Sequence, residues 1–307
     1  MRPRFAADYR ALLFALVIFP LGPCLALSNV RLLPWLLPVV FYSTYVAGVL
    51  AHNQNHCPVF KSRGLNAAYG IWLSAFYGVP TFAWIPTHNQ NHHRHLNGPG
   101  DATPTNRVGL QPKLGAMMVY AVKAGIWQFP LIRSHIKKLA RRRPLALLVP
   151  SLQLLAVVGA HVVVLGLALT LHGTKTGLWV YAWSFGIPVA LAAPLLQATN
   201  YLQHVSCDST SLDDHSRNFT SPLFNWLFFN NGFHTVHHEH PGTHWTQYPT
   251  LHQARAARIA PTLNQATPLH FWWNVLGPKR ASFTARSTDD FRQRLEPQPN
   301  HITFTDT

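Results

Sequence analysis

The sequence predicts an all-α polytopic membrane protein with about four transmembrane helices, re-entrant or interfacial helices, and a cytoplasmic helical cap. Two observations predict this class. Only 11% of the 307 residues are charged, whereas a soluble domain carries about 25% charged residues. Four uncharged apolar runs also approach the roughly 17–25 residues that a helix needs to cross a bilayer. A third observation, groups of histidines beside these runs, indicates what the cap holds.

The four candidate spans are residues 11–27, 32–51, 145–171 and 177–199. Several prolines fall inside them, and membrane helices tolerate proline better than exposed soluble helices do. The first run follows a short charged segment, as the apolar part of a signal peptide does. We expect a retained anchor instead, because a second apolar run follows at once.

Two further segments are not expected to cross the membrane. Residues 64–87 are uncharged but rich in Gly, Pro and aromatic residues, and histidine groups lie on both sides of them. A full crossing would separate those groups, so we expect a re-entrant or interfacial hairpin. Residues 114–132, broken by Lys123 and Pro130, are expected to form another interfacial helix.

The basic residues predict the orientation, because short cytoplasmic loops are rich in Lys and Arg. Lys and Arg are frequent in residues 52–144, whereas the two short loops on the other side hold only Arg31 and Lys175. We therefore expect a protein of the cell inner membrane with both termini and every histidine group on the cytoplasmic side. The net charge of +15 then reflects topology and attraction to anionic lipids. No base-reading motif favours nucleic acid.

The layout predicts a single membrane domain over residues 1–280 and a polar C-terminal tail over 281–307. The cytoplasmic cap of that domain is expected to be made from residues 52–144 and 200–280. No internal repeat divides the chain, and the three cysteines have no CxxC spacing. Neither a disulfide framework nor a zinc ribbon is therefore expected.

Two histidine groups share one spacing. The sequence HNQNH contains His52 and His56, and HNQNHH contains His88, His92 and His93. Residues four apart lie on one face of a helix, one turn from each other. The amides between the histidines are candidates for fixing the orientation of the imidazoles.

A third group consists of His234, His237 and His238, followed at once by Glu239. Glu239 either orients a ligand histidine or is a surface acid, and the spacing leaves both roles open. His204 ends the last candidate span, with Asn200 one helical turn before it. Because all the histidine groups are expected on the cytoplasmic side of the membrane, His204 is a candidate metal ligand. Asn200 is a second candidate, which would bind the metal directly or through a water molecule.

These nine imidazoles exceed what one metal ion binds, since zinc sites close at four ligands. Two metal ions with four or five ligands each fit the number, so the cap is expected to hold a dimetal site. No catalytic residue is expected apart from that site. Iron accepts imidazole ligands and its open positions allow O₂ chemistry, but the ligand type alone leaves zinc or nickel open.

The complete pattern resembles the integral-membrane fatty acid desaturase/hydroxylase superfamily, whose motifs are HxxxH, then HxxHH or HxxxHH, then HxxHH. The pair Asn200 and His204 is similar to the isolated late histidine of that family. The resemblance covers roughly residues 35–255. It implies four spans and a cytoplasmic non-haem centre of two iron ions. It also implies O₂ as co-substrate and removal of hydrogen from an unactivated alkyl C–H bond.

Two branches compete within this resemblance. HNQNHH and the NYLQH at residues 200–204 look like alkane hydroxylases, whereas residues 231–242, followed by Leu251 and His252, look more like acyl lipid desaturases. We favour a desaturase, with hydroxylation or oxidative decarboxylation as the alternatives. The HPGT at residues 240–243 is similar to the haem-binding HPGG of cytochrome b5 but differs in its last residue. A separate ferredoxin-like or other small carrier is therefore expected to supply electrons.

The substrate implied by the resemblance is a fatty acyl chain linked to CoA, acyl carrier protein or a lipid. A hypothesis from another class is a metal transporter with a histidine-rich face. Transport normally needs ionisable groups along the path through the bilayer. His161 is the only acidic, basic or imidazole side chain inside the four candidate spans, and it has no charged partner there. This argues against transport.

Overall fold

The computed structural model describes residues 2–276, and helices make up most of them. The helices in chain order are α1 (Asp8–Leu13), α2 (Phe19–Ser28), α3 (Leu33–His56), α4 (Arg63–Tyr77), α5 (His93–His95), α6 (Leu114–Arg142), α7 (Leu148–Tyr181), α8 (Ile187–His204), α9 (Pro222–Leu227), α10 (His234–Glu239), α11 (Tyr248–Arg255) and α12 (Pro268–Leu276). The strands β1 (Asn218–Phe219) and β2 (Asn264–Gln265) form a short parallel pair. The predicted all-α class is confirmed apart from this pair, and the predicted tail at 281–307 lies outside the described residues.

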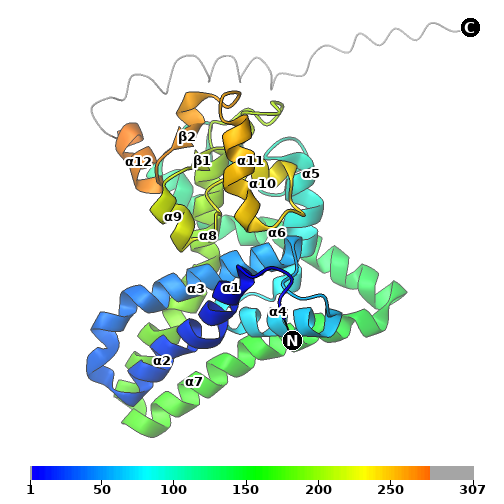
Figure 1. Cartoon of the computed structure of the whole chain (residues 1–307). Coiled ribbons are helices and arrows are strands. Elements are labelled where there is room, and N and C mark those ends of the chain that lie inside the picture. Colours follow the sequence, from blue (N-terminus) through cyan, green and yellow to red (C-terminus); the bar gives the residue numbers. More distant parts are fainter. Residues whose placement is uncertain (1, 277–307) are drawn as a thin grey trace, which may run out of the picture.

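The molecule divides into an apolar half and a cap. In Figure 1, α1–α4 and α7 gather in the lower half, whereas the short helices α9–α12 lie together in the upper half. Within residues 2–276, three continuous helical stretches are long and apolar enough to cross a membrane, namely Asp8–Ser28, Val30–His56 and Pro144–His204. Together these stretches contain all four predicted spans.

The third stretch contains two predicted spans because the chain reverses inside it. The backbone of Gly173 has φ 70° and ψ 176°, which interrupts α7, and glycine adopts such values without steric cost. Beyond this point the chain folds back closely. A Cβ atom on Gly177 would lie 2.5 Å from the carbonyl oxygen of Ala168. The runs 145–171 and 177–199 are thus the two arms of one helical hairpin.

The segment 64–87 forms a hairpin, as the sequence predicts. Helix α4 has 15 residues, fewer than the roughly 17 that a span requires, and it ends at Gly78 with φ 78°. The chain then folds back, because Thr81 donates to the carbonyl oxygen of Gly70 at 3.3 Å. Asn55 of α3 donates to the carbonyl oxygen of Thr81 at 3.1 Å. The hairpin therefore returns to the end of α3 from which it started.

Helix α6 differs from the expectation. The sequence predicts a helix over 114–132, and α6 contains this range but extends beyond it, running through Pro130 as one helix of 29 residues. It packs against α8 on one side. The basic residues that follow Pro130 are consequently part of a rigid helix rather than of a loop.

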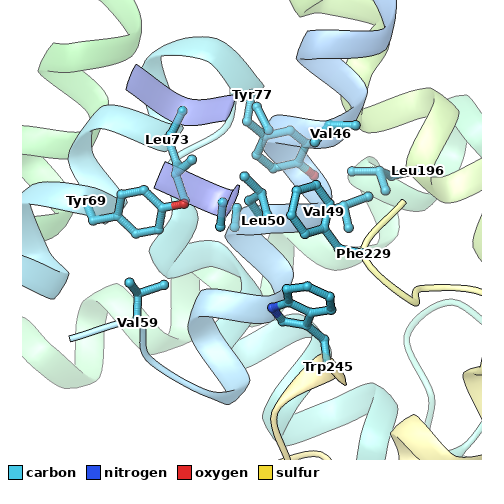
Figure 2. Close-up of a cluster of buried hydrophobic side chains, with 14 of the residues drawn as sticks. Val46, Val49, Leu50, Val59, Tyr69, Leu73, Tyr77, Leu196, Phe229 and Trp245 are labelled. Carbon is cyan, nitrogen blue, oxygen red and sulfur yellow. The ribbon is translucent and has the colours of Figure 1, made fainter. Parts of the chain in front are cut away.

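The hydrophobic core joins the apolar helices to the cap. Leu50 of α3, Tyr77 of α4 and Leu196 of α8 belong to the same buried cluster as Phe229 and Trp245 of the cap, as Figure 2 shows. Burial of each large apolar side chain stabilises the fold by about 1.5–3 kcal/mol. This packing fixes the ends of α3 and α8 against the cap.

Candidate metal centre

The nine predicted histidines come from five elements and converge. They are His52 and His56 on α3, His88 and His92 on the π-helical segment Ile85–His92, His93 at the start of α5, His204 at the end of α8, and His234, His237 and His238 on α10. The ring nitrogens of eight of them form two groups of four, and within each group they lie within 4.8 Å of one another. The first group is His52, His56, His88 and His237, and the second group is His92, His204, His234 and His238.

Local helix geometry decides which group each imidazole joins. A π-helix bonds each residue to the fifth one along, so His88 and His93 stand one above the other, with their Nε2 atoms 3.1 Å apart. His93 therefore lies beside the first group as a fifth imidazole. His92 points instead to the second group, with its Nε2 atom 3.1 Å from that of His204.

The ring nitrogens that meet inside each group are Nε2 atoms. In the first group, the Nε2 atom of His52 lies 2.9 Å from that of His88 and 3.1 Å from that of His237. In the second group, the Nε2 atom of His204 lies 3.0 Å from that of His234 and 3.2 Å from that of His238. No carboxylate belongs to either group.

In His92 and His204 of the second group, the opposite ring nitrogen, Nδ1, contacts the surrounding protein. The Nδ1 atom of His92 lies 2.7 Å from Oδ2 of Asp101, and that of His204 lies 3.2 Å from the carbonyl oxygen of His215. A neutral imidazole has one N–H donor and one acceptor, so Nδ1 donates and Nε2 carries the lone pair. Lone pairs that face each other at about 3 Å repel unless a cation lies between them. The donor set therefore fits two metal ions.

Burial keeps His88, His93, His234 and His237 neutral, which is the form that binds metal. Burial, with the neighbouring imidazoles, holds the pKa of His88, His234 and His237 well below the usual 6.5. The same causes lower the pKa of His93 to about 3. The groups thus need no deprotonation near neutral pH before a metal binds.

The histidine spacing gives no indication of Asp101, which the structure brings to the site. Its carboxylate accepts hydrogen bonds from Nδ1 of His92 and from the backbone N–H groups of Asn97 and Thr103. Burial raises the pKa of Asp101, but His92 and these hydrogen bonds lower it further, to a value below its usual range. The carboxylate of Asp101 is therefore ionised while it accepts the hydrogen bond from His92. The sequence does contain one indication of this role, because Asp101 is the single acidic residue in residues 52–144.

Asn91, an amide of the second histidine motif, holds the loop that carries Asp101. Its side chain donates to the carbonyl oxygen of Gly100 at 2.9 Å and accepts from the backbone N–H of Ala102 at 2.7 Å. These two hydrogen bonds fix the position of Asp101, and Asp101 in turn fixes the orientation of the His92 ring. The amides between the histidines therefore also position the site indirectly.

Asn200 and Glu239 have different surroundings. The side-chain amide of Asn200 donates to Oη of Tyr120 at 2.8 Å, and Asn200 lines the cavity beside the imidazoles. Glu239 forms an ion pair with Arg255 at 2.5 Å. Both carboxylate oxygens of Glu239 are buried, so the two roles left open for Glu239 stay predictions.

A cavity of about 340 Å³ opens onto the imidazoles. His52, His88, His92 and His234 are part of its lining. Much of the remaining wall is apolar and includes Val49, Ala83, Trp84, Val122, Ile132 and Leu196. An elongated apolar ligand in this cavity would lie directly against both groups.

The comparison with protein families agrees with this geometry. A family model described as fatty acid desaturase matches residues 28–267. The chain belongs to the fatty acid desaturase family. Nothing among the curated proteins or the solved structures matches the chain significantly. Both groups fall inside the matched range.

Membership in the fatty acid desaturase family confirms the predicted superfamily. The protein is therefore an integral membrane oxidoreductase of the desaturase/hydroxylase type, and its family acts on fatty acyl substrates with non-haem iron. The apolar helices and the histidine groups agree with this class. The hypothesis of a metal transporter has no support in the comparison.

Proposed function

We propose that this desaturase-family enzyme uses O₂ to introduce a C=C bond into a fatty acyl chain. The observation that carries the proposal is the cavity of about 340 Å³, which is lined both by imidazoles and by apolar side chains. A methylene of an alkyl chain in this cavity lies next to the proposed metal site. The apolar wall also keeps water away from that methylene.

Nine imidazoles are proposed to hold two iron ions, one in each group, with His93 beside the first. When bound, the two irons supply the activation of O₂ and the removal of hydrogen from the alkyl chain. Asn200 is proposed to reach the iron of the second group directly or through water. Its amide nitrogen is held by Tyr120, which leaves the amide oxygen as the ligand atom.

The protein side chains control position and protonation. Trp84 stacks edge-on against His52 and His88, with ring centroids 5.2 and 5.1 Å away, and it also lines the cavity. Trp84 therefore fixes the end of the cavity relative to the imidazoles. Asp101 keeps the proton of His92 on Nδ1, so that Nε2 stays free for the metal. Reaction outcome depends on such positioning, because a shift of about 1 Å changes rates by about 100-fold.

The setting and the partners are part of the proposal. We infer one membrane domain over residues 1–280 in the cell inner membrane, with termini and metal site on the cytoplasmic side. The frequency of Lys and Arg in residues 52–144 supports this orientation. Electrons come from a separate ferredoxin-like or other small carrier. The acyl chain is linked to CoA, acyl carrier protein or a lipid.

The decisive experiment is expression of the full chain in a host with a defined lipid pool. Mass spectrometry of the fatty acids should show new products that lack two hydrogens, and a His92→Ala variant should not form them. Products that gain one oxygen would instead assign hydroxylation. Metal analysis should find two irons per chain, whereas exchangeable zinc without O₂ consumption would contradict the proposed site.

A further inference from the structure

A second cavity, of about 540 Å³, lies between the second histidine motif and the C-terminal half of α6. It shares no lining residue with the cavity beside the imidazoles. Its basic lining residues are Arg94, His95, His135, Lys138, Arg142 and Arg143. The rest of the lining is neutral, and none of it is acidic.

The charge of this basic cavity is not balanced by nearby protein groups. Among residues 2–276, the ion pairs involve none of its basic side chains. Burial lowers the pKa of His135, and repulsion from Lys138 lowers it further. Gln90, Asn91 and Ser134 add neutral polar groups. Guanidinium and ammonium groups carry only donors, so the complementary ligand is an anion with several acceptor oxygens, such as a phosphate.

The position of the cavity in the chain places it at a membrane surface. Arg142 and Arg143 directly precede Pro144, where the third candidate span begins. Leu145 and Leu148, which follow, are 90% and 62% exposed. Apolar side chains exposed at this point face lipid in an integral membrane protein, so the preceding arginines lie at the level of the head groups.

The apolar face of α6 supports the same placement. Met118, Ile126 and Phe129 recur at helical spacing and are 59–67% exposed. A helix with such a face and a basic end lies along the membrane surface, with the apolar side towards the acyl chains. The basic cavity lies on the other side of α6, at the C-terminal end of the helix, which the start of the span at Pro144 holds at the level of the lipid phosphates.

We propose that the basic cavity binds the phosphate of an anionic membrane phospholipid. The lipid head group lies against Pro86, Gln90 and Asn91, which belong to the segment that also carries His88 and His92. Occupancy of the cavity therefore braces that segment from the side opposite the imidazoles. This site does not depend on which reaction the enzyme catalyses.

The test measures lipid binding to the purified full chain in detergent. Phosphatidylglycerol and phosphatidylcholine are titrated separately, and bound lipid is counted by native mass spectrometry. The pocket variant is Lys138→Gln with Arg142→Gln. The matched control is Lys137→Gln with Arg141→Gln, which makes the same charge change one residue earlier on α6 and outside the lining.

The pocket variant should bind phosphatidylglycerol about thirtyfold more weakly, since each Lys or Arg near anionic lipid contributes about fivefold. The control variant should stay close to the unmodified chain, and phosphatidylcholine should bind weakly to all three. Arg94→Gln, on the opposite wall, provides a second variant with an expected loss of about fivefold. Thermal unfolding of each variant verifies that it is folded.

Two results would overturn the proposal. An equal loss in the pocket and control variants would mean that only the overall charge of α6 attracts lipid. CoA is titrated in a parallel arm as a soluble source of phosphate. Loss of CoA binding in the pocket variant, with unchanged phosphatidylglycerol binding, would assign the cavity to a soluble acyl carrier instead.

Discussion

Substitution of Asp101 by asparagine tests whether the second group binds its metal through a correctly held His92. Oδ2 of Asp101 accepts from Nδ1 of His92 at 2.7 Å and from the N–H of Asn97 at 2.9 Å. Oδ1 accepts from the N–H and the hydroxyl of Thr103 at 2.8 and 3.2 Å. Whichever way an asparagine amide is turned, its NH₂ group faces two of these donors. The hydroxyl of Thr103 can also accept, so the substitution breaks one or two of these hydrogen bonds, and it removes the negative charge beside His92 while it keeps the volume.

The expected loss follows from these contacts. Removal of a group that orients a metal-binding histidine costs about 10- to 100-fold in metal affinity, or about 1.4–2.7 kcal/mol. The loss should be confined to the second group, because no imidazole of the first group bonds to Asp101 in the described residues. A competing chelator should therefore remove about one metal ion per chain from Asp101→Asn under conditions in which the unmodified enzyme keeps both. Turnover should fall with the lost metal.

Asp213→Asn is the control, because Asp213 is a partly exposed acid that pairs with Arg255 at 2.7 Å. It should retain both metals. Thermal unfolding of each variant separates loss of metal from loss of fold. If folded Asp101→Asn keeps both metals with unchanged resistance to the chelator, then Asp101 does not position a metal ligand.

Further predictions concern the groups, the cavity, the end of α8 and pH. His237→Ala should lose the metal of the first group and His92→Ala that of the second, and each should abolish turnover; full activity in either variant would refute the site. A Cβ atom on Gly125 meets nothing within 4 Å and Gly125 lines the cavity, so Gly125→Leu should fold normally, keep its metal and convert long acyl chains at least about tenfold more slowly. Equal conversion would place the substrate elsewhere. Arg217 donates to the carbonyl oxygens of Leu202 and Val205 at the end of α8, so Arg217→Met should lower the free energy of unfolding by about 2 kcal/mol; an unchanged melting temperature would contradict this role. In metal-free protein, the lowered pKa values of His88, His234, His237 and His238 mean that the unfolded chain binds more protons below about pH 6.5. Stability should therefore be full above that pH and should fall as the pH decreases, by about 1.4 kcal/mol per pH unit for each imidazole; pH-independent unfolding between pH 7 and 5 would refute buried neutral histidines.

The sequence by itself determined the class of the protein, because class depends on composition and local spacing. Few charges and long apolar runs are properties of the chain alone, and they predict membrane helices. Histidines four residues apart share a helix face whatever the tertiary structure is. The count of nine imidazoles likewise implies two metal ions before any distance is known. The requirement that all groups share one side of the membrane also predicts the hairpin at 64–87.

The tertiary structure decided how the imidazoles are divided between the two groups. The sequence places His92 and His93 side by side, but a π-helical turn directs them to different groups. The helix expected over 114–132 also extends to Arg142 in the structure, where α6 packs against α8. The spacing of residues in the sequence determines which face of a helix each residue occupies. It does not determine which other segment of the chain packs against that face.

Asp101 is the clearest case of a contact that only the tertiary structure decided. No spacing rule connects it to His92, because the loop between them must first be folded by Asn91. The same holds for His52 and His237, whose Nε2 atoms lie 3.1 Å apart although most of the chain separates them. Such contacts arise when the core joins α3 and α8 to the cap, and packing of distant segments is a property of the whole fold.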